Sequence, residues 1–120
     1  MIAVAKCRLG VICRYHGKAV PSPSLIKNLH GKAFFPVCPE MEAGLPVPRP
    51  PIKRRHGKLY LANKDITNLL ETFSQVRVKE LRDLGVNLFI GVKGSPCCDP
   101  FSGLFARNLK GEGIKVRLSL

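Results

Sequence analysis

The five cysteines are the residues of this chain whose chemistry is easiest to interpret. They stand at positions 7, 13, 38, 97 and 98. A secreted disulfide framework normally has an even number of cysteines, whereas thiols in a reducing compartment serve as buried fillers, metal ligands or nucleophiles. The opening residues meet a charge at Lys6, too early for the apolar core of a signal peptide. We therefore expect reduced thiols and a cytoplasmic protein.

Three short apolar runs, each followed by cysteine, predict buried strands over residues 2–6, 33–37 and 86–92. The cysteines that follow these runs are Cys7, Cys38 and the Cys97–Cys98 pair. The carboxyl ends of parallel strands meet at one edge of a sheet, where ligands gather. We therefore expect the three groups of thiols to share a site.

The other sequence signals predict the elements that hold these strands together. Helices are expected after Ser22-Pro23, over about 66–84 with Asp65 as its cap and Gly85 as its end, and over 104–110. A last strand is expected over 113–118, and a small strand or hairpin arm over 57–62. The proline-rich stretch from Pro39 to Pro51 excludes a central strand or a helix interior.

The alternation of strands and helices predicts the fold class. Strands that alternate with helices form a mostly parallel sheet with right-handed crossovers. The chain has 120 residues, the length of one domain. We expect a small single α/β domain over residues 1–120, with a mostly parallel, Rossmann-like sheet flanked by helices.

The cysteine spacing narrows the metal chemistry. Zinc ribbons and knuckles use cysteines two to four residues apart, and Cys7 and Cys13 are more widely spaced. The side chains of the adjacent Cys97 and Cys98 tend to diverge, so three strand-end ligands remain, with Cys13 and Cys97 as spares. Three thiolates suit an iron–sulfur cluster or a zinc ion with an open position. A 4Fe–4S cluster with three cysteine ligands leaves one iron free to act as a Lewis acid, and we favour it over zinc.

Six motifs follow one another along the chain and carry a family resemblance. They are Cys7-Arg8-Leu9-Gly10 with Arg14-Tyr15-His16-Gly17, Val37-Cys38-Pro39-Glu40 with Gly44-Leu45-Pro46-Val47-Pro48-Arg49, Asp65-Ile66-Thr67 with Phe73, Ser95-Pro96-Cys97-Cys98, Phe101-Ser102-Gly103 and Gly113-Ile114-Lys115-Val116. In this order they resemble the domain-of-unknown-function family 523, which includes thiouracil desulfurases. The resemblance implies a small cytoplasmic, hydrolase-like enzyme with a three-cysteine 4Fe–4S cluster.

The resemblance also implies roles for individual residues. Cys7, Cys38 and Cys98 match the cluster ligands, Glu40 the acidic residue beside the second ligand, and Ser95 the serine of the last motif. The implied reaction is a non-redox desulfuration of a 2-thiouracil-like pyrimidine, in which the open iron binds sulfur and water replaces it on carbon. Glu40 would activate the water as general base, and Ser95 would hydrogen-bond the substrate or relay a proton.

Several positions depart from the family pattern. His16, Val47, Cys97 and Asp99 replace the usual Asp, Thr, Ser and Gly, and the segment between residues 103 and 113 is shortened. A glycine at position 99 can supply a special backbone angle, and Asp99 places a negative charge beside a thiolate. An inactive family member that retains only the fold is therefore one alternative.

The charge of the chain supports a second alternative. Twenty Lys and Arg against eight Asp and Glu give a net charge of +12, which favours a polyanion partner such as tRNA. A basic nucleic-acid-binding module, with a structural metal or none, is the alternative from another class. Tyr60 is the only aromatic near the basic cluster Arg49–Lys58. No apolar run approaches the roughly 18–20 residues of a membrane helix, so we expect no membrane partner.

Overall fold

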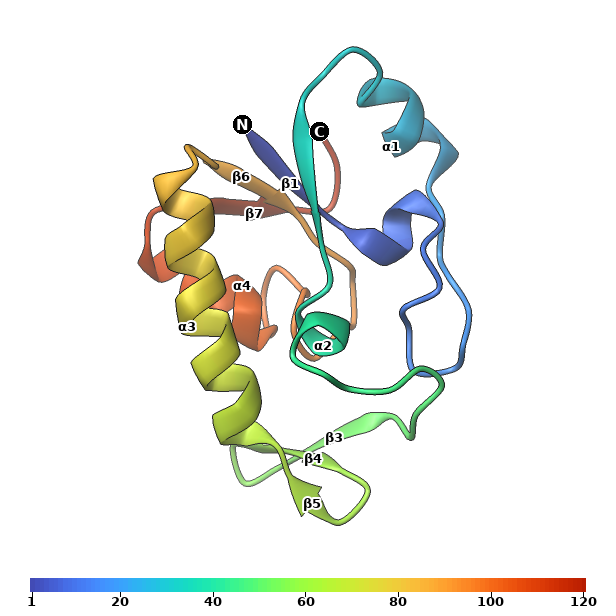
Figure 1. Ribbon diagram of the computed structural model, residues 1–120, viewed down its shortest axis with the longest axis vertical. Coiled ribbons are helices and arrows are strands. Elements are labelled where there is room, and N and C mark those ends of the chain that lie inside the picture. The colour runs from blue at the N-terminus through green and yellow to red at the C-terminus, as the bar shows by residue number, and fades with distance from the viewer.

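A parallel four-stranded sheet forms the centre of the computed structural model, which describes residues 1–120. Its strands, in spatial order, are β2 (Phe34–Val37), β1 (Ile2–Ala5), β6 (Leu88–Ile90) and β7 (Lys115–Arg117). All three neighbouring pairs are parallel, and Figure 1 shows β1 between β2 and β6. The α/β prediction is confirmed.

Helices cover both faces of this sheet. They are α1 (Pro23–Asn28), α2 (Pro39–Glu42), α3 (Thr67–Asp83) and α4 (Leu104–Gly111), with a 3₁₀ helix over Lys6–Leu9. Val4 and Ile90 point to one face and pack with Leu25 and Leu29 of the α1 segment. Alternate strand residues such as Phe89 point to the other face, into the larger core that α3 and α4 share. None of the helices combines the length and the apolar composition needed to cross a bilayer.

The third predicted strand is shorter than expected, because its ends are engaged elsewhere. Val86 and Val92 are buried but lie outside β6. The Val92 N–H donates to the carbonyl of Cys98 at 3.0 Å, which turns the chain into the loop after the strand. Burial of an apolar run therefore extends beyond its ladder hydrogen bonds.

The proline-rich segment from Pro39 to Pro51 contains one short helix, α2. The sequence analysis excluded a central strand and a helix interior in this segment, and it did not predict a helix there. Pro39 occupies the first position of α2. A backbone N–H at this position has no partner within the helix, so the N–H that proline lacks costs no hydrogen bond. The remaining prolines follow α2 in irregular chain, and none lies inside a helix. The prediction fails to give α2 itself, since four residues show no helical period.

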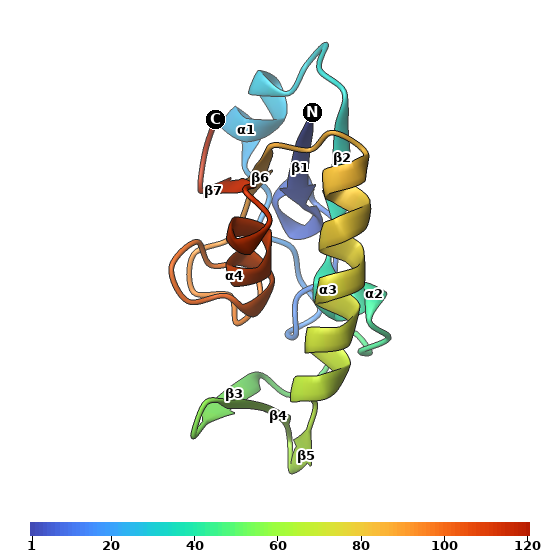
Figure 2. The same ribbon diagram turned by 90° about the vertical axis from the view of Figure 1, so that its left-hand side faces the viewer.

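A second sheet projects from the body and is larger than the predicted arm. Its antiparallel strands are β3 (Ile52–Arg55), β4 (Lys58–Leu61) and β5 (Lys64–Asp65), and Figures 1 and 2 show it beyond the first turn of α3. His56 and Gly57 join β3 to β4 with positive φ angles of 51° and 76°, as a tight hairpin turn requires.

Candidate metal and substrate site

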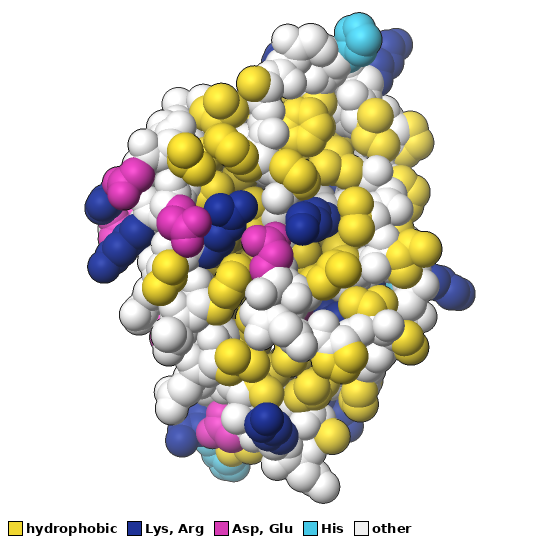
Figure 3. Space-filling model, in the orientation of Figure 1, with side chains coloured by type: hydrophobic (Ala, Val, Ile, Leu, Met, Phe, Trp, Pro, Cys, Tyr) yellow, Lys and Arg dark blue, Asp and Glu magenta, His cyan; other side chains and the backbone are white.

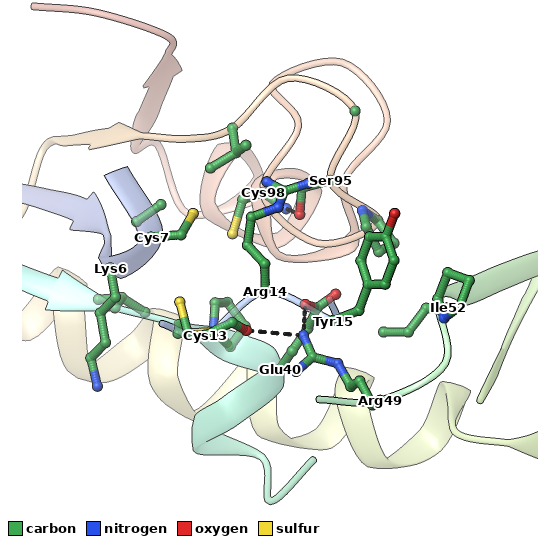
Figure 4. Close-up of a pocket in the computed structure, with 18 residues that line it drawn as sticks. Lys6, Cys7, Cys13, Arg14, Tyr15, Glu40, Arg49, Ile52, Ser95 and Cys98 are labelled. Carbon is green, nitrogen blue, oxygen red and sulfur yellow. Dashed lines mark hydrogen bonds and ion pairs between the residues drawn. The ribbon is translucent and has the colours of Figure 1, made fainter. Parts of the chain in front are cut away.

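One cavity of about 190 Å³ lies at the carboxyl ends of β1, β2 and β6. The five site residues that the sequence analysis names all line it, and they are Cys7, Cys38, Glu40, Ser95 and Cys98. In Figure 4 the labelled thiols of Cys7 and Cys98 face into the same space. The parallel sheet therefore brings together residues that are far apart in the sequence.

Cys7 and Cys38 are placed by the turns that end their strands. Cys7 lies in the 3₁₀ helix that directly follows β1, and Cys38 is the residue that caps the start of α2. The Cys38 N–H donates to the Glu42 carboxylate at 2.6 Å. Glu42 is held in turn by Lys6 and by Arg77 of α3, each at 3.4 Å. The backbone of Cys38 is thus fixed by Glu42 and Arg77, which do not line the cavity, and by Lys6, which does.

Ser95 organises the loop that carries Cys98. Its Oγ accepts hydrogen bonds from the N–H groups of Cys97 at 3.3 Å and Cys98 at 3.0 Å. Cys98 lines the cavity, whereas Cys97 is buried without lining it. The side chains of the two adjacent cysteines therefore diverge, as the sequence analysis expects.

Two glycines allow this loop to approach the sheet and α4 closely. A Cβ at Gly91 would collide with the carbonyl of Cys98, and a Cβ at Gly103 would collide with the backbone of Cys97. Backbone atoms cannot move aside as the end of a side chain can. The absence of a side chain at both positions is therefore a condition for the placement of Cys98.

Asp99 fastens the same loop through its carboxylate. Its carboxylate accepts hydrogen bonds from the N–H groups of Gly94, Phe101 and Ser102 at 2.7, 2.8 and 3.0 Å. These bonds, led by the one from Gly94, lower the pKa of Asp99 below its ordinary value. Position 99 is not among the residues with positive φ, so it does not use the special backbone angle that a glycine can supply.

Cys13 is a fourth thiol of the cavity, which the sequence analysis set aside as a spare. The neighbouring thiols of Cys38 and then Cys7, together with burial, raise the pKa of Cys13 well above its ordinary value. The neighbouring Cys13 thiol, followed by the charge of Arg14, lowers the pKa of Cys7 to about 7. The same partner lowers the pKa of Cys38. Two of the proposed ligands are thus biased toward the thiolate form, whereas burial raises the pKa of Cys98.

A buried ion pair holds Glu40 at the cavity. Arg49 Nη2 lies 2.5 Å from Glu40 Oε2, and the Arg49 side chain is only 1% exposed. Arg49 also donates to the carbonyls of Pro46 at 3.0 Å and Cys13 at 3.2 Å, and Figure 4 shows its contact with Glu40. The partner of Arg49 is therefore the carboxylate of Glu40.

Arg14 and Tyr15 complete the lining on the side of the first loop. The sequence analysis did not name Arg14 as a site residue, although it directly follows Cys13. Its Nε is buried and has no hydrogen-bond partner. Tyr15 is 39% exposed, so its ring lies where the cavity meets solvent. None of the three histidines lines the cavity.

The donors of the cavity fit an iron–sulfur cluster. The structure as it stands brings no three His, Cys, Asp or Glu side chains together around one point. A cluster of four irons and four sulfides is broader than one ion, so its ligands surround a cavity rather than a point. Soft thiols are also the ligands that iron–sulfur clusters use. The donor set therefore fits the cluster that the sequence analysis favoured.

Comparisons with known proteins match almost the whole chain. The chain is 26% identical over 133 residues to the uncharacterized protein YbbK of Bacillus subtilis (strain 168), covering 98% of this chain and 88% of that protein. Its structure is similar to that of the [4Fe-4S]-dependent thiouracil desulfidase TudS (DUF523Vcz), with a TM-score of 0.83, 26% identity, and coverage of 97% and 88%. Neither comparison supports a nucleic-acid partner. Residues 2–119 match the family described as 2-thiouracil desulfurase, and the chain belongs to this family.

Proposed function

We propose that this protein is an iron–sulfur-dependent thiouracil desulfidase. In the proposed reaction, the thiocarbonyl of a 2-thiouracil-like pyrimidine and one water become a carbonyl and hydrogen sulfide, with no transfer of electrons. The observation that carries the proposal is the lining of one cavity by Cys7, Cys38 and Cys98 together with Glu40 and Ser95. The similarity to TudS, itself a [4Fe-4S]-dependent enzyme, supports the same assignment.

The proposed cluster ligands are Cys7, Cys38 and Cys98. All three are buried, with exposures of 6%, 8% and 6%, so a cluster there is shielded from water. When bound, the cluster supplies an iron without a protein ligand, a soft Lewis acid that attracts the substrate sulfur and polarises its bond to carbon. Cys97 does not line the cavity and has no ligand role in this proposal.

Glu40 is the proposed general base. Its Oε2 is engaged by Arg49, and the same carboxylate carries a second oxygen that can accept a proton from water. The ion pair holds the carboxylate in one place at the cavity wall, which is the positioning that base catalysis needs. The acceptors that bind Arg49 prevent this pair from swinging away.

Ser95 is the proposed hydrogen-bond donor to the substrate. Its oxygen already accepts two backbone N–H groups, and a hydroxyl has two acceptor positions and one donor. Its O–H is therefore the part left to bind a substrate atom. We assign it the donation of a hydrogen bond to the heterocycle rather than the removal of a proton.

Cysteine substitutions with a matched control test the cluster ligands. After anaerobic reconstitution with iron and sulfide, we expect the wild type to bind about four irons per chain. Each of the variants C7S, C38S and C98S should lose most of this iron and the visible absorbance of the cluster. C97S removes a thiol that is equally buried but outside the cavity, and it should keep both. A full iron count in any of the three ligand variants would remove that residue from the set.

A further inference from the structure

Arg14 is the only cationic side chain of the cavity lining that has no carboxylate partner. Of the other two, Lys6 lies 3.4 Å from Glu42, and Arg49 lies 2.5 Å from Glu40, the one acidic residue of the lining. Pairs of this kind are visible in Figure 3, where acidic and basic side chains lie next to each other over the middle of the molecule. Arg14 forms no ion pair, so its positive charge is not neutralised by the protein.

The side chain of Arg14 is directed toward the proposed cluster ligands. In Figure 4 it extends from the first loop into the cavity, in the direction of Cys98 and Ser95. Its Nε is buried and has no hydrogen-bond partner. The charge of Arg14 also contributes to the lowered pKa of Cys7. A positive charge with a free, buried N–H donor therefore lies beside the thiols.

The backbone that carries Arg14 is fixed on both sides of the residue. Arg49 donates to the carbonyl of Cys13 through Nη2 at 3.2 Å and to the carbonyl of Tyr15 through its backbone N–H at 2.8 Å. The Gly17 N–H donates to the carbonyl of Arg14 itself at 3.0 Å. The charge of Arg14 is thus held at the cavity wall by a loop that Arg49 anchors.

A cluster with three cysteine ligands needs a positive charge in such a place. Its three thiolates carry more negative charge than its oxidised core carries positive charge, and a buried charge without compensation is unfavourable. Reduction adds a further electron, so a nearby cation stabilises the reduced form more than the oxidised form. Because Lys6 and Arg49 are already paired, Arg14 is the residue of the lining that can supply this charge.

We propose that Arg14 compensates the negative charge of the cluster in this cavity and thereby raises both its retention and its reduction potential. The inference rests on the proposed function, since it concerns the cluster that this function requires. Iron that is poorer in electrons is a stronger Lewis acid and attracts a soft substrate sulfur more strongly. Arg14 is therefore a positioning residue that acts through the cluster, without a bond to the substrate.

The test is an anaerobic redox titration of the reconstituted protein, followed by the visible absorbance of the cluster. R14Q removes the charge and keeps a side chain with an N–H donor. At a fixed potential, its ratio of reduced to oxidised cluster should be about tenfold lower than that of the wild type. For a one-electron couple this corresponds to a midpoint potential about 59 mV more negative. R14K, which keeps the charge, should retain most of the wild-type potential.

K18Q is the matched control for the change in charge. Lys18 lies in the same loop but is exposed and does not line the cavity. Its removal should change the ratio of reduced to oxidised cluster less than twofold. The rate of iron loss to a chelator should rise severalfold in R14Q and stay unchanged in K18Q. Equal potentials in R14Q and the wild type, or equal shifts in R14Q and K18Q, would overturn the proposal.

Thermal unfolding of the cluster-free proteins separates this role from a structural one. Since Arg14 has no carboxylate partner to lose, cluster-free R14Q should have a Tm at least as high as that of the cluster-free wild type. Loss of the cluster from a folded R14Q protein would therefore support the proposal. A lower Tm of cluster-free R14Q would instead make Arg14 a structural residue.

The same preparations distinguish a failure of this inference from a failure of the proposed function. A wild-type protein that binds no cluster would contradict both. A cluster that responds to R14Q as expected, in a wild-type protein that does not convert 2-thiouracil, would contradict the proposed function alone. An unchanged potential in R14Q together with a raised KM for 2-thiouracil would overturn this inference alone and make Arg14 a substrate contact.

Discussion

The ion pair between Glu40 and Arg49 fixes the position of the carboxylate that we propose as the general base. A guanidinium that is almost fully buried needs a charged partner, because an unpaired buried charge costs several kcal/mol. Glu40 meets that need through one oxygen. The residue therefore has a structural and a chemical role, and a test must separate the two.

We predict that E40Q retains the cluster and loses turnover of 2-thiouracil. The amide keeps the size and an acceptor for Arg49 but cannot take a proton from water, so kcat should fall roughly 10²- to 10⁴-fold. Iron content and initial rates measured on the same preparation check this. E40D, which keeps a carboxylate, should recover part of the rate and so separates lost basicity from lost stability. Unchanged turnover in E40Q would remove Glu40 from the mechanism.

At the scale of elements, the loop between β6 and α4 depends on the two glycines that let it fold back. Gly103 faces backbone atoms of Cys97, whereas Gly111 at the end of α4 has open space where a side chain would stand. The same substitution should therefore have opposite effects at the two positions.

We predict that G103A lowers the free energy of unfolding by about 1–3 kcal/mol or more, as overpacking does, and reduces iron retention by displacing Cys98. G111A should be neutral or stabilising by up to about 1 kcal/mol, since alanine is the better helix former. Denaturant titrations and iron counts of both variants check the prediction. A G103A protein as stable as G111A would show that the loop does not require the close approach.

The start of α3 gives a prediction about pH. Asp65 accepts a hydrogen bond from the Thr67 N–H at 2.9 Å, and this bond is the main cause that lowers its pKa. A carboxyl whose pKa is lowered by folding stabilises the folded state above its ordinary pKa near 4, and the contribution is lost as pH falls through the lowered value. D65A should therefore have a lower Tm than the wild type at pH 7, and the difference should shrink below about pH 3. A difference in Tm that does not depend on pH would contradict an ionic role for Asp65.

At the scale of the whole molecule, the proposed ligands link three strands of one sheet. Cys7 follows β1, Cys38 follows β2 and Cys98 lies in the loop after β6. A group that binds all three in the folded state only must stabilise the entire domain. We predict that anaerobic removal of the cluster lowers the Tm on the order of 10 °C, as followed by circular dichroism. C98S, treated in the same way, should show little change; an equal change would place the stabilising site elsewhere.

The sequence predicts the features of this molecule that depend on residues close together in the chain, and it does not predict contacts between distant residues. The apolar runs before Cys7 and Cys38 predict two strands correctly because burial of a strand is a local pattern. The contact between Arg49 and Glu40 is not predictable, since it depends on the path of the irregular chain after α2. The pairing of β3 with β4 was missed because cationic residues fill β3 and hide its alternation. Only the register reveals that Lys53 and Arg55 share a face with Tyr60.

The wall of the cavity is finished by a segment that is translated after most of its other residues. Ser95 and Cys98 leave the ribosome later than Cys7, Cys13 and Cys38, and β6, which precedes them, pairs with β1. The nascent polypeptide therefore exposes Cys7, Cys13 and Cys38 before their enclosure exists. Until that enclosure forms, these early thiols depend on the reducing power of their surroundings.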